Sequence, residues 1–269
     1  MLDRFDLTKK VVLITGGAGL LGVMHAEAIA EAGGTPVLLD LDLESTQDQA
    51  KEISKNFSSE CLALMGDVTN QESVKHALEE ILRKYGRVDV IINNAALNPK
   101  IQDGTSSLNT NLENLDLDIF NKELEVGLTG SIIVSKIFGT YMAGQGKGVI
   151  INISSDLGII APDQRIYSTK GVQSFKPVSY SVLKHGIIGL TRYLSTYWAH
   201  KGIRTNALCP GGVFDDQPEE FVTKLNNLIP LGRMAERGEY KGAIQFLSSD
   251  ASSYMNGSIL VIDGGRTAW

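Results

Sequence analysis

Val12-Leu-Ile-Thr-Gly-Gly-Ala-Gly-Leu-Leu-Gly22 is an apolar run that passes into a glycine-rich turn. The apolar residues predict a buried strand over 11–15, and the pattern of residues 23–32 after the turn predicts a helix. Gly16, Gly19 and Gly22 would let the backbone of such a turn approach a pyrophosphate at the helix N-terminus. The segment therefore predicts the first strand, turn and helix of a nucleotide-binding α/β fold.

Short apolar runs alternate with amphipathic segments along the rest of the chain. Runs with the character of strands cover 11–15, 37–40, 62–65, 88–93, 149–154, 205–209 and 259–262. Helix-period stretches cover 23–32, 44–56, 72–85, 119–142, 180–200 and 240–247. Continuous apolar strands separated by helices predict a doubly wound α/β domain, with a mainly parallel sheet of about seven strands covered on both faces. We expect one domain over residues 1–269.

The bulk composition favours a folded, water-soluble protein. The 269 residues are 43% hydrophobic and 21% charged, and no apolar run is long enough to cross a bilayer. The net charge of −6 argues against nucleic acid or an anionic membrane as a partner, because both require a concentrated positive face. The charged N-terminus lacks the apolar core of a signal peptide, and the two cysteines suit a reducing compartment. We expect a cytoplasmic protein with a small-molecule substrate.

Polar residues follow three of the predicted strands. Asp40 ends the second strand, where an acidic side chain can bind both ribose hydroxyls and repels a 2′-phosphate, which favours NAD over NADP. Asp67 and Val68 follow the third strand, and Asn94 and Ala95 follow the fourth. Ligands bind at the carboxyl ends of strands in open α/β sheets, so these residues are expected to border the same site.

A tyrosine and a lysine share one face of the helix predicted over 180–200. Tyr180 and Lys184 stand at i and i+4, and a lysine charge would lower the pKa of the phenol toward working pH. Such a phenol can protonate a carbonyl oxygen as hydride arrives, or deprotonate an alcohol in the reverse direction. Upstream, the predicted strand over 149–154 leads to the hydroxyl of Ser155, which can hydrogen-bond the reacting oxygen.

These motifs together resemble the short-chain dehydrogenase/reductase family, in its compact branch. The resemblance rests on the glycine turn, Asn93-Asn94-Ala95-Ala96, Ser154-Ser155, Tyr180…Lys184, Gly202-Ile-Arg-Thr-Asn-Ala-Leu-Cys-Pro-Gly211 and the tail through Ile262-Asp-Gly-Gly265, in order over nearly the whole chain. It implies a Rossmann-type sheet, a nicotinamide cofactor and a homodimer or homotetramer.

The resemblance also implies roles for individual residues. Ser155 would orient the substrate carbonyl, Tyr180 would be the acid/base, and Lys184 would bind the nicotinamide ribose and tune Tyr180. Asn94 falls on the motif that steadies the central sheet, with Ala96 in place of its usual glycine. The full set expected to bind NAD is Gly16, Gly19, Leu21, Gly22, Asp40, Asp67, Val68, Asn94, Ala95, Tyr180, Lys184, Pro210, Gly211 and Val213.

Three positions depart from the family pattern. Leu20 stands where the compact branch has glycine, so the glycine spacing follows the extended, nucleotide-sugar-modifying branch. Gly127 replaces an asparagine that kinks a helix and holds a relay water, so proton transfer from the lysine must differ or be slower. No threonine follows Pro210-Gly211 to hold the nicotinamide amide, and we expect backbone contact at Val213 instead.

Two segments, 97–118 and 156–179, are long for loops beside such a site. Tyr180 lies 25 positions after Ser155, about twice the usual spacing in the family. Arg165 and Tyr167 in the second segment could line a pocket for a polyhydroxylated or anionic substrate, although a solvated insertion or a subunit contact is the alternative. The loops and the Gly-Gly-Arg-Thr-Ala-Trp269 ending resemble oxidoreductases of bacterial surface-sugar and flagellin-modification clusters.

Three functions remain open from the sequence. The first is an NAD(H)-linked alcohol/carbonyl oxidoreductase, acting on a sugar or sugar-acid intermediate of surface glycan synthesis. The second, favoured by the glycine spacing, is an epimerase or dehydratase that retains its NAD. The third, motivated by Gly127, is a catalytically silent NAD-binding scaffold. The four histidines do not share metal-ligand spacing, so no metal site is expected.

Overall fold

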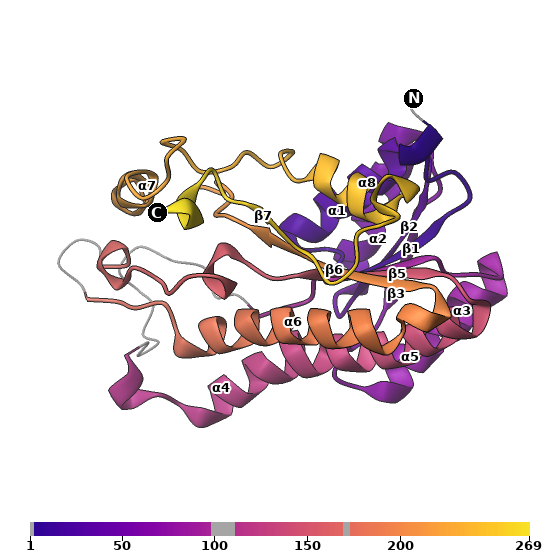
Figure 1. Ribbon diagram of the computed structural model, residues 1–269, viewed down its shortest axis with the longest axis horizontal. Helices are drawn as coiled ribbons and strands as arrows, with labels where there is room; N and C mark the ends of the chain where they lie inside the picture. Colours follow the sequence, from indigo (N-terminus) through magenta and orange to yellow (C-terminus); the bar gives the residue numbers. More distant parts are fainter. Residues whose placement is uncertain (1–2, 98–110, 169–172) are drawn as a thin grey trace.

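A computed structural model describes residues 3–97, 111–168 and 173–269, which form one seven-stranded parallel sheet between two layers of helices (Figure 1). The strand order is β3-β2-β1-β4-β5-β6-β7. The chain therefore runs to one side of β1 and then returns to the other side at β4, which makes the β1/β4 boundary the topological switch point of the sheet. The predicted doubly wound, Rossmann-type α/β fold is confirmed.

The strands are β1 (Val11–Thr15), β2 (Thr35–Asp40), β3 (Leu62–Met65), β4 (Val90–Asn93), β5 (Gly148–Ile153), β6 (Ile203–Pro210) and β7 (Ile259–Ile262). The bounds predicted for the first, third and last strands are correct. The predicted sixth strand was too short, because polar Arg204 interrupts the apolar run although it pairs with Val149 of β5.

Two layers of helices cover the sheet (Figure 1), and alternate residues of β1 pack into the cores under the two layers. One core lies under α1 (Leu20–Glu31), α2 (Leu43–Phe57) and α8 (Lys241–Ser248), and includes Val12 and Ile14. The other lies under α3 (Gln71–Tyr85), α5 (Gly130–Gln145) and α6 (Val178–Tyr197), and includes Leu13 and Ile91. Burial on both faces is why the strands are continuously apolar.

The helix predicted over 119–142 is interrupted. It consists of α4 (Leu117–Leu124), a π-helical turn over Glu125–Thr129, and α5. Gly127 lies in the turn, where an added Cβ would come within 2.6 Å of Leu183 on α6. The combined helix, 117–145, is long and apolar enough to cross a membrane, but half of its most apolar window is buried inside the protein. This burial is typical of a core helix.

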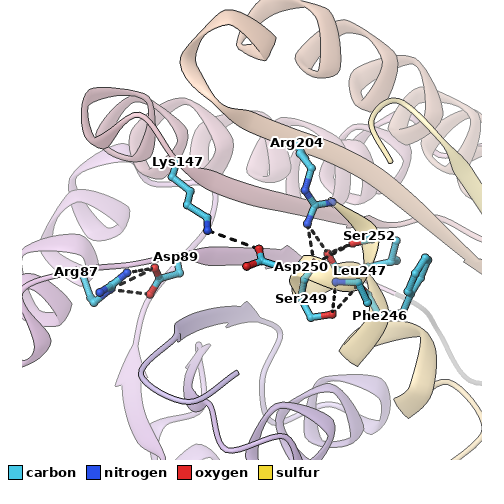
Figure 2. A network of polar contacts seen from close by, with 10 residues as sticks. Arg87, Asp89, Lys147, Arg204, Phe246, Leu247, Ser249, Asp250 and Ser252 are labelled. Atoms are coloured by element: carbon cyan, nitrogen blue, oxygen red, sulfur yellow. Dashed lines mark hydrogen bonds and ion pairs between the residues drawn. The ribbon is translucent and has the colours of Figure 1, made fainter. Parts of the chain in front are cut away.

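Polar contacts fasten the amino-terminal end of the sheet (Figure 2). The Arg204 guanidinium on β6 donates to the carbonyls of Leu247 and Ser249 at the end of α8, at 3.3 and 3.1 Å. Just before β4, Arg87 donates to both carboxylate oxygens of Asp89, and Asp89 also accepts the backbone N–H of Val11 at 2.9 Å. These contacts lie at the end of the strands opposite to the functional site described next.

A third, smaller apolar cluster joins the long segment after β5 to the segment after β6. It contains Tyr167 and helix α7 (Glu219–Asn226), whose Phe221 ring lies 5.6 Å from the Tyr167 ring. Helix α7 was not predicted, because its eight residues include only three apolar ones and its partner Tyr167 is distant in the sequence. The cluster covers one end of the cleft at the carboxyl edge of the sheet.

Candidate active site

The glycine turn lies at the carboxyl end of β1, at the topological switch point. Gly16 has φ of +63°, and an added Cβ there would lie 2.9 Å from the Cα of Ala95. An added Cβ at Gly22 would lie 2.1 Å from the Gly16 carbonyl oxygen, so that glycine lets α1 pack against the turn. Gly16, Gly19 and Leu21 line the cleft, whereas Gly22 supports the turn from behind.

Asp40, at the end of β2, also lines this cleft. Its carboxylate accepts the backbone N–H groups of Ala18 and Leu41 at 3.1 and 2.8 Å, so the glycine turn itself fixes its position. Asp67 and Val68 line the cleft from the end of β3, with the Asp67 carboxylate held by the backbone and hydroxyl of Thr69.

Asn94 ties the end of β4 to the glycine turn. Its side-chain amide donates to the carbonyls of Thr15 and Gly16 at 2.9 and 3.1 Å. The Thr15 hydroxyl in turn accepts the backbone N–H groups of Asn94 and Ala95. Behind this contact, Asn93 donates to Asn152 on β5 at 2.8 Å, a buried amide pair that the sequence analysis did not single out. Isolated asparagines at strand ends give no sign of their pairing partner.

Ser155, Tyr180 and Lys184 meet at the other end of the cleft. The Lys184 ammonium lies 5.7 Å from the centre of the Tyr180 ring and donates to the Ile153 carbonyl at 3.0 Å. The Ser154 hydroxyl donates to the Lys184 backbone carbonyl at 2.7 Å, which joins the end of β5 to α6. Helix α6 and strand β5 thus bring the predicted triad together, although its serine and tyrosine are far apart in sequence.

The electrostatics of the pair differ from the expectation. Desolvation raises the pKa of Tyr180 to about 12. Desolvation and the nearby positive charge of Lys176 lower the pKa of Lys184 to about 8. The expected lowering of the tyrosine pKa is therefore wrong for the chain without a bound molecule. Burial of the phenol outweighs an ammonium that lies beside its ring and bonds to a carbonyl.

Lys176 was missed by the sequence analysis. Its ammonium lies 3.8 Å from the centre of the Tyr180 ring and lines the cleft, and desolvation lowers its pKa to about 8. The side-chain amide of Gln164 accepts the Lys176 backbone N–H at 2.8 Å, so the inserted segment holds this lysine in place. Its position four residues before Tyr180 was the available signal, but Pro177 places Lys176 outside the helix.

The cleft has a volume of about 930 Å³ and extends from Asp40 to the cluster around Tyr167. Pro210, the last residue of β6, lines it together with Gly211 and Val213, and the Val213 carbonyl accepts the side-chain amide of Gln217 at 2.9 Å. Tyr167 lines the cleft while its ring packs in the small apolar cluster.

Arg165, the other residue expected to contact substrate, is not among the residues lining the cleft. Its exposed side chain instead pairs with Asp163 at 2.6 Å, because both belong to one turn of the surface segment. The hydroxyl-rich part of the expected 97–118 loop lies outside the described residues. In the described parts of the chain, no three His, Cys, Asp or Glu side chains gather as a metal site would require.

The cleft suits a dinucleotide. Added Cβ atoms at Gly16 and Gly22 would collide with backbone, so these glycines keep the turn close-packed and open toward the cleft. The carboxylate of Asp40 borders the same space at one end, and Ser155, Tyr180 and Lys184 border it at the other. This fold and this site are those expected of a protein that binds a nucleotide beside an acid/base pair.

Comparisons with known proteins identify the family. The profile described as enoyl-(acyl carrier protein) reductase matches residues 18–267. The NAD-dependent glycerol dehydrogenase of Listeria innocua is 31% identical over 98% of this chain and 96% of that protein. The crystal structure of a short-chain type dehydrogenase/reductase from Mycobacterium marinum superposes with a TM-score of 0.86 at 29% identity, covering 100% and 99% of the two chains. The chain belongs to the short-chain dehydrogenase/reductase family, and it is an oxidoreductase that acts on CH–OH groups with a nicotinamide cofactor.

Other relatives differ in cofactor and context. A gluconate 5-dehydrogenase from Burkholderia cenocepacia, solved with NADP and tartrate, has a TM-score of 0.87 at 28% identity and covers 100% and 99% of the two chains. A Campylobacter coli protein named post-translational flagellin modification protein A is 29% identical over 96% of this chain and 98% of that protein. The family therefore does not decide between NAD and NADP, nor the pathway.

Proposed function

We propose that this protein is an NAD(H)-dependent oxidoreductase that transfers hydride between nicotinamide and a secondary alcohol of a sugar or sugar acid. The observation that carries the proposal is one cleft bordered by Asp40 at one end and by Ser155, Tyr180 and Lys184 at the other. The acidic side chain at the end of β2 favours a ribose with free hydroxyls over one with a 2′-phosphate.

The chemistry follows from the positions of these side chains. The bound nicotinamide supplies or accepts the hydride. In reduction, the Tyr180 phenol gives its proton to the carbonyl oxygen, and in oxidation the tyrosinate takes the proton of the alcohol. Ser155 would hold the reacting oxygen, and the Lys184 ammonium would bind the nicotinamide ribose and stabilise the tyrosinate.

The substrate class rests on the charges around the phenol. Lys176 lines the cleft near Tyr180, and a cationic group of this kind favours substrates with hydroxyl or carboxylate oxygens. The gluconate dehydrogenase and the flagellin-modification relative support a sugar acid of surface glycan synthesis as the first substrate to test.

Cofactor choice is tested by calorimetric titration of NADH and NADPH. We expect NADH to bind more tightly by about 1–3 kcal/mol, because the 2′-phosphate faces the Asp40 carboxylate and loses hydrogen bonds. Asp40→Asn should reduce the difference between the NADH and NADPH affinities. Asp48→Asn, an equal charge change at an exposed position of α2, should leave that difference unchanged. Equal or tighter NADPH binding by the wild type would overturn the NAD assignment.

Turnover is tested by following NADH absorbance over a panel of sugars, polyols and sugar acids. Net oxidation or reduction of at least one member is the expected result. Cofactor that copurifies and turns a substrate over without net reduction would favour an epimerase. NADH binding with no turnover of any alcohol or carbonyl would favour a scaffold.

We also propose that the protein forms a homodimer or homotetramer in solution and that it is cytoplasmic. Val182, Tyr193 and Tyr197 lie along one face of α6 and are exposed, with Tyr193 stacked on Tyr197 at 5.5 Å. A row of large exposed side chains on one helix face is suited to pairing with a second copy. Light scattering of the wild type and of Tyr193→Glu tests this, and a monomeric wild type would contradict it.

A further inference from the structure

A buried ion pair lies directly behind the proposed catalytic serine. Asp156 follows Ser155, and its Oδ2 lies 2.7 Å from the guanidinium of Arg266, three residues from the end of the chain. The two side chains are only 4% and 6% exposed. Burying a carboxylate and a guanidinium carries a large desolvation cost, so an ion pair at this place calls for a specific reason.

The tail of the chain is folded so that Arg266 reaches this position. After β7, the Asp263 carboxylate accepts the backbone N–H groups of Gly265 and Thr267, both at 2.8 Å. Gly264 and Gly265 have φ of +67° and +91°, which side-chain-bearing residues rarely adopt. The turn places Arg266 inside the cleft wall while the following Trp269 is exposed.

The other oxygen of Asp156 faces the serine. Oδ1 lies 2.7 Å from the Ser155 hydroxyl and accepts the backbone N–H of Leu157 at 2.8 Å. An ionised carboxylate has no proton to give, so the Ser155 hydroxyl must donate its only proton to Asp156. The lone pairs of Ser155 are then left for the Leu157 N–H, at 3.2 Å, and for a donor in the cleft that Ser155 lines.

We infer that Asp156, held in place by Arg266, is a positioning residue that sets the rotamer and proton direction of Ser155 for the oxidoreductase reaction. Ser155 then presents an acceptor to the reacting oxygen, which matches the hydroxyl of an alcohol and the phenol of Tyr180. A carbonyl substrate can receive the serine proton only after the Ser155–Asp156 hydrogen bond has broken. The inference rests on the proposed role of Ser155 and adds two residues that act through it.

Asp156→Asn is a sharp test because the three neighbours of the carboxylate are all donors. An asparagine has nearly the same shape but carries an N–H₂ group on one side. In one orientation the N–H₂ group faces the Arg266 guanidinium. In the other it faces the Leu157 N–H and the Ser155 hydroxyl. Asp156→Asn must therefore disturb the ion pair or the serine without opening a cavity.

The chain offers a matched control at the other end of the sheet (Figure 2). Asp89 likewise lies between an arginine, Arg87, and a backbone N–H, that of Val11. Asp89→Asn removes the same charge from the same kind of pair, but far from the cleft. We expect it to lower the melting temperature and leave kcat within about twofold.

The decisive experiment is a double-mutant cycle with Ser155→Ala, in which kcat, NADH affinity and melting temperature are measured for each variant. Asp156→Asn alone should lower kcat by about 10- to 100-fold, the order expected when a reacting group is displaced, with NADH affinity within about twofold. In the Ser155→Ala background, Asp156→Asn should lower kcat by less than about threefold more, because its effect passes through the serine. Arg266→Gln should behave like Asp156→Asn, and Arg266→Lys should recover most of kcat.

Two results would overturn the inference. One is a folded Asp156→Asn protein with kcat within about threefold of the wild type. The other is a fall in kcat that is equally large in the Ser155→Ala background, which would indicate a general structural role. If Asp156→Asn does not fold, the comparison of Arg266→Gln with Arg266→Lys in the two backgrounds decides the question.

The rotamer of Ser155 can be observed without substrate, so this inference can be tested separately from the proposed function. Crystal structures of the wild type and Arg266→Lys should show Ser155 in the same rotamer, with its Oγ on Asp156, and Arg266→Gln should show it turned away. An unchanged rotamer in Arg266→Gln would count against the positioning role. A wild type that turns over no substrate but shows this rotamer change would contradict the proposed function alone.

Discussion

At the scale of single residues, the site depends on how burial shifts proton affinities. The pKa of Tyr180 is raised to about 12 by desolvation, and the pKa of Lys184 is lowered to about 8 by desolvation and by Lys176. The phenol is thus held protonated, and the ammonium is close to losing its charge in the physiological range. Bound cofactor and Lys184 must together make the tyrosinate accessible.

Tyr180→Phe removes the proton donor and little else. We expect turnover to fall by about 10²–10⁴-fold, the usual contribution of a positioned acid or base, with NADH affinity nearly unchanged. Tyr193→Phe, the same change on the exposed face of α6, is the control and should retain full activity. If Tyr180→Phe kept more than about a tenth of the wild-type rate, another group would be the acid/base.

The Lys184 charge predicts how NADH affinity depends on pH. Because its pKa is about 8, affinity should be constant at lower pH and should weaken as pH rises through 8, where the ammonium deprotonates. The decrease should be at most about tenfold per pH unit, the limit for one linked proton. Lys176→Gln removes the neighbouring positive charge and should move the decrease to higher pH. Calorimetric titrations from pH 6 to 10 measure both, and affinity that is flat across this range would contradict the assignment.

At the scale of elements, the π-helical turn between α4 and α5 packs closely against α6 at a position without a side chain. Gly127 lies in the turn, and Leu183 of α6 occupies the space that its side chain would fill. The family pattern has an asparagine where Gly127 stands, and Leu183 fills the space that an asparagine side chain would need.

Gly127→Asn should destabilise the protein by about 1–3 kcal/mol, because its Cβ would overlap the Leu183 methyl groups. Leu183→Ala removes the obstacle, so the double variant should be more stable than the sum of the single effects predicts, with a coupling of about 0.5–3 kcal/mol. Chemical denaturation of the four proteins measures this coupling. Additive effects would show that Leu183 does not fill the asparagine position.

At the scale of the whole molecule, one buried histidine couples the stability of the fold to acid. His25 on α1 is 1% exposed, and desolvation lowers its pKa to about 3, with an opposing interaction from Asn94. The unfolded chain binds a proton at this histidine near its ordinary value of about 6.5. Between these two pKa values the unfolded state holds more protons, so stability falls as pH falls.

His25→Leu should therefore reduce the loss of stability between pH 6.5 and pH 3, by up to about 1.4 kcal/mol per pH unit, and leave the slope above pH 7 unchanged. His76→Gln, on the exposed surface of α3, is the control and should keep the wild-type slope. Denaturant titrations at several pH values without cofactor give the comparison. Equal slopes for His25→Leu and the wild type would show that folding does not lower the pKa of His25.

Local patterns in the sequence were enough to predict the sheet, the glycine turn and most of the site. The predictions for β1, β3 and β7 matched because a run of apolar residues bounded by polar ones depends only on neighbours along the chain. Tyr180 and Lys184 could be paired for the same reason, since helical geometry alone puts i and i+4 on one face. The family motifs then placed Ser155 with them.

Only the tertiary structure decided which distant groups surround that centre. Arg266 returns from the end of the chain to Asp156, and Lys176, which lies outside α6, is held over the Tyr180 ring by Gln164 of the inserted segment. The π-helical turn likewise depends on Leu183, which belongs to another helix. Burial, pKa values and the direction of a serine proton are set by contacts between residues up to 110 positions apart, and no pattern of neighbouring residues contains them.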